Sequence, residues 1–179
     1  MAESNDTAES VNLLARALEQ AHAAIQGVRD EELDQPTPCT GWDVGQLLAH
    51  LAVGPGYLLD MARGGSPDWS AVPDRVDDPA GQFRTGADEL LAHWRDSDPA
   101  ERQGMDWQIA EFAAHTWDVV TATGQTPDLD PDVAERGLAF MSAVLKPEMR
   151  ADAFAPEQRA PDDATPHERL AAFAGRTVR

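Results

Sequence analysis

The chain is poor in cysteine and lacks long apolar runs. Cys39 is the single cysteine in 179 residues, so no internal disulfide can form and a reducing cytoplasm is the expected compartment. No apolar run approaches the ~18 residues that a membrane-spanning helix needs. Residues 1–10 are polar and acidic, without the basic start and apolar core of a signal peptide. We therefore expect a soluble, cytoplasmic protein.

Basic residues are also scarce. Lys and Arg number 14 against 32 Asp and Glu, which gives a formal net charge of -18. Such a surface repels phosphate backbones and anionic lipid, so we expect neither nucleic acid nor a membrane surface as a partner. Hydrophobic residues make up 42% of the chain, enough for one domain over residues 1–179 with a core that needs no disulfide.

Apolar residues recur at steps of three and four, the period of amphipathic helices. The pattern predicts a helix capped by Ser10, with residues 1–9 frayed. A second helix is predicted to begin near Thr40–Asp43, where Thr40 and Asp43 resemble a capping box, and to stop at Gly64. The Gly54-Pro55-Gly56 run suggests a kink or an interruption within it. Further helices are predicted over residues 80–96, 107–123, 131–145 and 166–174. Residues 146–166 read as irregular, and no strand pattern appears. The predicted fold is all-α: an up-down four-helix bundle with one or two additional short C-terminal helices.

Three residues on two of these helices form a candidate metal site. Glu111 and His115 are four residues apart, so their side chains lie on one helix face. With His50 from the second helix they offer nitrogen, oxygen and nitrogen donors and leave coordination positions open, as catalytic zinc sites do. The alternative, which the spacing leaves about equally open, is two ordinary half-buried histidines and a solvated acid. Such donors accept Zn, Ni, Fe or Mn.

Neighbouring residues allow two interpretations each. Asp118, three residues after His115, either orients the His115 ring or is a surface acid. Cys39 precedes the second helix, and the N-terminus of a helix can lower the pKa of a thiol and make it reactive. The favoured interpretation is instead that Cys39 packs as a small buried hydrophobic residue. Trp42 and Trp117 are expected to be core packing. Two interpretations also remain for Trp69, Trp94 and Trp107, which are either core residues or exposed aromatic patches. Exposed patches would be consistent with a homodimer.

Two motifs in this order resemble a known family. The run Thr37-Pro38-Cys39-Thr40-Gly41-Trp42-Asp43-Val44, with Leu48-Ala49-His50-Leu51 after it, resembles the opening of the DinB-like family. It is most similar to the branch named for the N-terminal domain of mycothiol-dependent maleylpyruvate isomerase. Glu111-Phe112-Ala113-Ala114-His115-Thr116-Trp117-Asp118 resembles that branch's second motif. The tail from Phe154 to Arg176 resembles the end of a compact actinobacterial subgroup.

The resemblance implies a four-helix bundle that holds a divalent metal, usually zinc or nickel, through His50, Glu111 and His115. It also implies that the metal activates a low-molecular-weight thiol such as mycothiol or bacillithiol, which attacks a small electrophile. Relatives are often dimeric. The chain ends at Arg179 and is expected to lack the isomerase's second domain, so maleylpyruvate isomerisation itself is not expected.

The leading hypothesis is thus a metal-dependent thiol transferase or isomerase, with residues 146–166 expected to cover the pocket. Two alternatives are a metal-dependent hydrolase that uses bound water and a non-catalytic metal- or ligand-binding stress protein.

Overall fold

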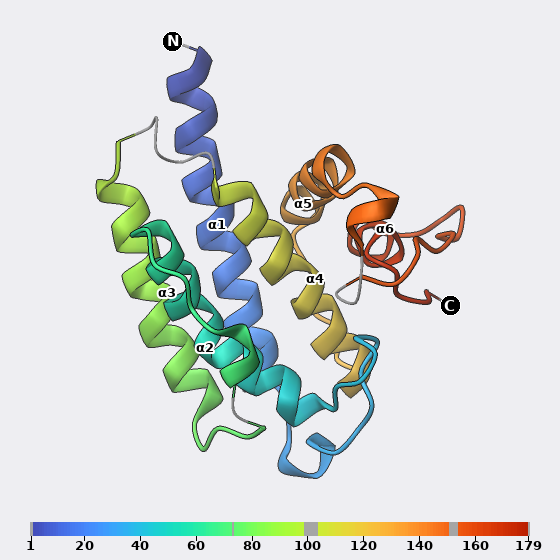
Figure 1. The fold of residues 1–179 in the computed structure, drawn as a ribbon. Helices are drawn as coiled ribbons and strands as arrows, with labels where there is room; N and C mark the ends of the chain where they lie inside the picture. Colours follow the sequence, from blue (N-terminus) through green and yellow to red (C-terminus); the bar gives the residue numbers. More distant parts are fainter. Residues whose placement is uncertain (1, 73, 99–103, 151–153, 179) are drawn as a thin grey trace.

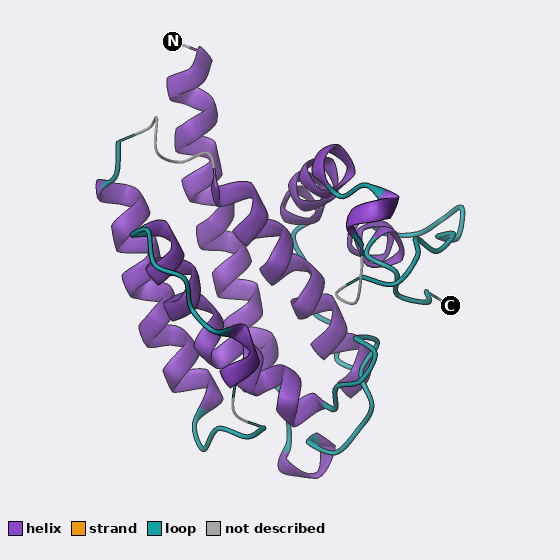
Figure 2. Ribbon diagram, viewed as in Figure 1, coloured by secondary structure: helices purple, strands orange, loops and turns teal. Residues whose placement is uncertain are grey.

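The computed structural model describes residues 2–72, 74–98, 104–150 and 154–178, with side chains from Glu9 onward. Six α-helices occur in these ranges: α1 (Ala2–Gln26), α2 (Val44–Ala62), α3 (Pro79–Asp96), α4 (Met105–Thr123), α5 (Pro131–Val144) and α6 (Pro166–Phe173). The same residues contain no strand (Figure 2). The predicted all-α bundle class is confirmed. None of the described helices is both long and apolar enough to cross a membrane.

The first four helices form the bundle. Helix α1 packs against α3 and α4, and α2 packs against the same two helices, so α1 and α2 lie on opposite corners. Helices α1 and α4 run in one direction and α2 and α3 in the other, because a long connection carries the chain back along the bundle after α2 (Figure 1). Helices α5 and α6 pack on the side of α4 that faces away from α3.

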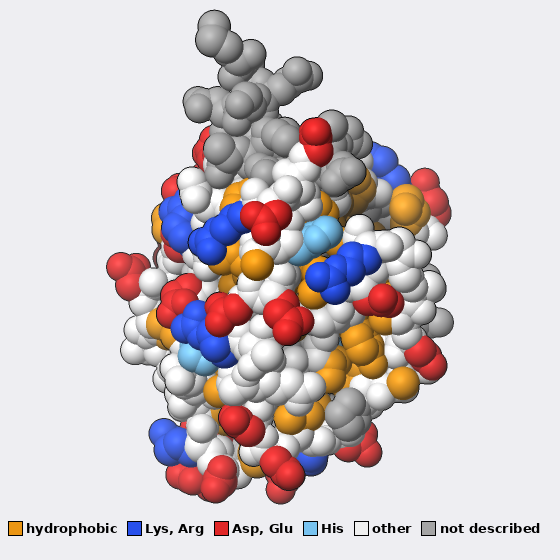
Figure 3. Space-filling view, turned by 90° about the vertical axis from the view of Figure 1, so that its left-hand side faces the viewer, with side chains coloured by type: hydrophobic (Ala, Val, Ile, Leu, Met, Phe, Trp, Pro, Cys, Tyr) orange, Lys and Arg blue, Asp and Glu red, His pale blue; other side chains and the backbone are white. Residues whose placement is uncertain are grey.

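The core consists of the apolar stripes that define the helices in the sequence. Leu14, Leu51, Phe83, Leu90 and Phe112 are almost completely buried where the four helices meet. The Phe83 and Phe112 rings meet edge to face with centroids 5.7 Å apart, an arrangement that aromatic quadrupoles favour. Acidic side chains and a smaller number of basic ones are scattered over the face seen in Figure 3, as the strongly acidic composition requires.

The predicted helix boundaries differ from the structure in two places. Helix α1 begins at Ala2, so residues 2–9, expected to be frayed, have helical backbone, while Met1 lies outside the described residues. Helix α2 is capped by Asp43 with Gln46, and the predicted box of Thr40 with Asp43 is wrong. The reason is Gly41, whose φ of 92° is left-handed and prevents a helix from starting before Asp43. The other boundaries agree within two residues.

Residues 146–166 contain one short 3₁₀ turn, Pro147–Met149, and otherwise irregular backbone where described; residues 151–153 lie outside the described ranges. Pro55 is inside α2 and does not end it, although the Gly-Pro-Gly run suggested an interruption.

Candidate metal centre

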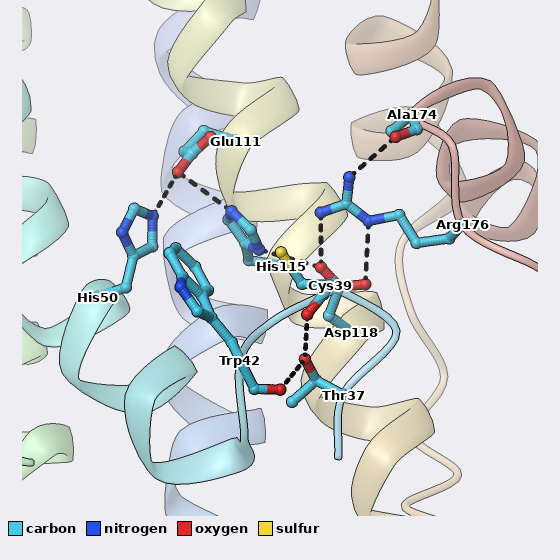
Figure 4. A network of polar contacts seen from close by, with 9 residues as sticks. All are labelled: Thr37, Cys39, Trp42, His50, Glu111, His115, Asp118, Ala174 and Arg176. Atoms are coloured by element: carbon cyan, nitrogen blue, oxygen red, sulfur yellow. Dashed lines mark hydrogen bonds and ion pairs between the residues drawn. The ribbon is translucent and has the colours of Figure 1, made fainter. Parts of the chain in front are cut away.

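Two packed helices bring the three predicted ligands together. His50 is on the second turn of α2, and Glu111 and His115 are one turn apart on α4. All three side chains are largely buried, with 10%, 13% and 9% of their surface exposed. The pairing of α2 with α4 therefore places two imidazoles and one carboxylate in a common space (Figure 4).

The carboxylate of Glu111 lies between the two imidazoles. Its Oε1 is 2.8 Å from Nε2 of His50 and 3.4 Å from Nε2 of His115. The rings of His50 and His115 meet nearly edge to face, with centroids 5.0 Å apart. One oxygen thus faces a nitrogen on each side, so Glu111 is not the solvated acid of the alternative interpretation.

Charges around Glu111 and His115 favour the ionised forms of these two side chains. Burial by itself would raise the pKa of Glu111, but the charges and hydrogen bonds of His115 and His50 outweigh burial and hold that pKa well below its usual range. Burial likewise opposes protonation of His115, yet Glu111 and Asp118 outweigh it and raise the pKa of His115 to about 9. A positive charge is therefore stabilised between these carboxylates.

Asp118 holds the other side of the His115 ring. Its Oδ2 lies 3.0 Å from Nδ1 of His115, and the residue is fully buried, which excludes the surface-acid alternative. Because Nδ1 donates its hydrogen to Asp118, Nε2 is directed at Glu111. Arg176 approaches the same carboxylate, with Nη2 2.8 Å from Oδ2 and Nε 3.2 Å from Oδ1. Hydrogen bonds and charge from His115 and Arg176 lower the pKa of Asp118 against the opposing effect of burial.

The loop before α2 builds one wall of the site. Its ends meet in an antiparallel bridge between Pro36 and Asp43, and the Thr37 hydroxyl donates to the carbonyls of Cys39 and Trp42. These bonds place the indole of Trp42 4.7 Å from the His50 ring and 5.9 Å from the His115 ring, measured between centroids. Trp42, expected to be simple core packing, is thus a wall of the site.

A cavity of about 410 Å³ opens beside the ligand atoms. This volume is within the range of small-molecule sites. Three tryptophans and Phe154 contribute to its walls, and Phe154 is the one described residue of the segment 146–166 that lines it. The described lining residues are Cys39, Thr40, Trp42, His50, Trp69, Trp107, Ala110, Glu111, Ala114, His115, Met141, Phe154 and Arg176.

Cys39 lines the cavity but is not activated. Burial raises the pKa of its thiol to about 11, so thiolate is scarce at neutral pH. Helix α2 begins after its N-cap Asp43, so Cys39 is not in the first turn of the helix. It forms a second possible ligand group with His115 and Asp118. There, however, Arg176 and the His115 ring already use both Asp118 oxygens.

The donor set of His50, Glu111 and His115 fits a divalent ion. Their ligand atoms all lie within 4.8 Å of one another. Donors bound to tetrahedral zinc at about 2.0–2.2 Å are roughly 3.3–3.6 Å apart, so small side-chain adjustments would suffice. Nitrogen and carboxylate oxygen donors suit zinc or nickel, and the carboxylate would offset part of the ion's charge.

Sequence reasoning missed Arg176 and the aromatic walls. Arg176 comes 58 residues after the carboxylate it contacts, and no local spacing relates the two. Trp69 packs against the His50 ring at a centroid distance of 5.3 Å, and Trp107 also lines the cavity. Of the other tryptophans singled out, Trp94 and Trp117 are buried.

Comparison with known proteins places the chain in a family. The model of the mycothiol maleylpyruvate isomerase N-terminal domain matches residues 14–106, just over half of the chain. The chain belongs to this family. The family match includes His50 and ends before Glu111, so the second motif is supported by the sequence resemblance and by the geometry of α4.

Two similar proteins come from Mycobacterium tuberculosis. Uncharacterised proteins of strains CDC 1551 and H37Rv are each 31% identical over 180 residues, covering 92% of this chain and 96% of the relative. No solved structure matches the chain. Family membership therefore rests on sequence, and the site on the geometry described above.

Proposed function

We propose that this protein is a divalent-metal-dependent enzyme that uses a low-molecular-weight thiol in a transfer or isomerisation reaction. The observation that carries the proposal is the convergence of His50, Glu111 and His115 beside a cavity of about 410 Å³. The family name supports the thiol, because it names mycothiol. Zinc or nickel is the proposed ion.

The residues around the donors have distinct tasks. His50, Glu111 and His115 would hold the ion, and Asp118 keeps Nε2 of His115 directed toward it through the bond at Nδ1. Trp42 and Trp69 pack against the His50 ring and restrict its rotation. A bound divalent ion would supply Lewis acidity that lowers the pKa of a thiol in the cavity, so no protein base is needed.

The side chains that line the cavity indicate what kind of electrophile it would accept. Arg176 is the one arginine or lysine among the described lining residues, and its guanidinium is already paired with Asp118 and the carbonyl of Ala174. A doubly anionic substrate such as maleylpyruvate would find little charge compensation from the described lining side chains. The aromatic walls favour an electrophile with an apolar surface.

The test begins with metal content. Untagged wild-type protein is expected to bind one equivalent of zinc or nickel, measured by elemental analysis and by calorimetric titration with zinc. His50→Ala and His115→Ala are expected to lose it. His93→Ala is the matched control, because this histidine of α3 contacts Ser97 and Trp94 and does not line the cavity. Metal contents that match wild type in both site variants would contradict the proposed site.

The reaction class is tested next with mycothiol and a chromogenic chlorodinitrobenzene as a general electrophile. Product that requires both thiol and metal supports the proposal. Turnover of ester or amide substrates without added thiol would support a hydrolase instead. Binding of mycothiol without turnover of any electrophile would support a non-catalytic binding protein.

A further inference from the structure

The segment that follows α6 turns at Gly175 toward the candidate metal centre. Helix α6 ends at Phe173, and the backbone N–H groups of Gly175 and Arg176 donate to the carbonyls of Ala172 and Ala171. Gly175 has a φ of 93°, a left-handed conformation that other residues adopt only at a cost. A Cβ atom at this position would lie 2.6 Å from the carbonyl oxygen of Ala155. The turn that sends Arg176 toward α4 therefore strongly favours glycine at this position.

Arg176 and Asp118 form a buried, two-point ion pair. The exposed fractions of the two residues are 7% and 0%. Nη2 and Nε of Arg176 lie 2.8 and 3.2 Å from separate oxygens of Asp118, while Nη1 donates to the carbonyl of Ala174 at 3.1 Å. A planar guanidinium bound at two points fixes the plane of the carboxylate as well as its charge.

The same carboxylate sets the orientation of a proposed ligand. Oδ2 of Asp118, which accepts from Arg176, is also the oxygen that lies 3.0 Å from Nδ1 of His115. If Arg176 is removed, the Asp118 carboxylate can rotate, and a buried charge loses its partner. The His115 ring then loses the fixed acceptor that turns Nε2 toward Glu111.

We propose that Arg176 is a positioning residue of the metal centre, which acts through Asp118 to hold His115 in the ligand orientation. In this arrangement the last turn of the chain is part of the site, although it contributes no ligand. The proposal rests on the proposed metal function, but the state of the His115 ring can be measured in protein without metal.

The experiment compares Arg176→Met, Arg176→Lys and Asp118→Asn with the double variant, by zinc affinity in competition with a chelator. Affinities are compared at a pH where they no longer change with pH. Arg176→Met is expected to weaken zinc binding by about 10–100-fold, the usual effect of losing a group that orients a ligand. Arg176→Lys should recover part of the loss. Arg159→Met is the matched control, since its side chain is 87% exposed and, among the described residues, pairs with Asp162 alone.

The double variant separates positioning from a general effect on folding. If Arg176 acts through Asp118, adding Arg176→Met to Asp118→Asn changes zinc affinity little beyond Asp118→Asn alone. Losses that multiply would overturn the proposal, as would wild-type affinity in Arg176→Met. Should Arg176→Met not fold, Arg176→Lys in the same cycle gives the same test.

Nitrogen NMR of the His115 ring supplies the readout that does not need metal. In wild type the Nδ1–H signal is expected to be hydrogen-bonded and protected from exchange. Arg176→Met should lose this protection, while Arg159→Met keeps it. An unchanged Nδ1–H signal in Arg176→Met would overturn the proposal. Failure of wild type to bind zinc, with loss of protection in Arg176→Met, would refute the metal function but keep the positioning role.

Discussion

Zinc and a proton should compete for Nε2 of His115, and this competition makes zinc affinity depend steeply on pH. In protein without metal, Glu111 and Asp118 raise the pKa of His115 from an ordinary 6.5 to about 9, against the opposing effect of burial. Its Nδ1 hydrogen is directed to Asp118, so the proton that zinc must displace is the one at Nε2.

The sign and size follow from this pKa. Below pH 9 most metal-free molecules hold the extra proton, so apparent zinc affinity should fall about tenfold for each unit by which pH is lowered. Between pH 9 and pH 7 the loss is about 50-fold, or about 2.3 kcal/mol, because half of the metal-free molecules already hold the proton at pH 9. With an unperturbed histidine, affinity would already be nearly constant in this range.

The assay is competition with a chelator of known pH dependence, at several pH values between 7 and 9.5. Calorimetry in buffers of different ionisation enthalpy gives an independent count of protons. About one proton per zinc should be released at pH 7, and only about a quarter of a proton at pH 9.5. A zinc affinity that is flat from pH 7 to pH 9, with no proton released at pH 7, would refute this reasoning.

Three further predictions concern the scaffold, each measured as the free energy of unfolding in denaturant. Asp43→Ala removes the acceptor for the N–H of Gln46 and should cost about 1 kcal/mol; no loss would show that the cap is not stabilising. Gly175→Ala should cost at least about 1–2 kcal/mol, because φ is 93° and the new Cβ meets a carbonyl, whereas the control Gly56→Ala in exposed helix should be neutral or stabilising. Burial lowers the pKa of His167 from 6.5 to about 4. Between these two pH values the histidine is protonated in the unfolded chain and neutral in the folded protein, so a fall in pH favours unfolding. Stability should therefore drop by about 2 kcal/mol from this group between pH 7 and pH 5, and His167→Gln should show a correspondingly shallower pH dependence; equal slopes would contradict the assignment.

Burial is the main cause of the lowered pKa of His167, and a hydrogen bond that fits only the neutral ring acts in the same direction. The backbone N–H of Asp130 donates to Oε1 of Gln20, which turns the Nε2 amide of Gln20 toward Nε2 of His167, 3.3 Å away. The histidine nitrogen must accept this bond and therefore carries no hydrogen. Protonation would place two donors against each other in a buried position.

The features that sequence predicted well are those set by local spacing. The four-residue step from Glu111 to His115 fixes their common face, and helical periodicity gave four of the six helices within two residues. The capping pair of α2 was assigned wrongly, because the left-handed backbone of Gly41 and the bridge from Pro36 to Asp43 decide where in the predicted range the helix begins.

Other features depend on contacts between segments that are distant in the sequence, so local sequence patterns could not predict them. The parallel course of α2 and α3 is set by the long connection between them (Figure 1). Trp42 lines the site only because its loop folds back over α2. Arg176 reaches Asp118 only after α6 has packed on α4 and α5. The ligand set was accessible from sequence, whereas the groups that orient it required the tertiary structure.

The most direct test of the central claim is an anomalous-diffraction map of zinc-loaded crystals, collected at the zinc absorption edge. We predict one strong peak at about 2.0–2.2 Å from Nε2 of His50, a carboxylate oxygen of Glu111 and Nε2 of His115. A map without a peak among these three side chains, or with zinc only on surface carboxylates, would contradict the account.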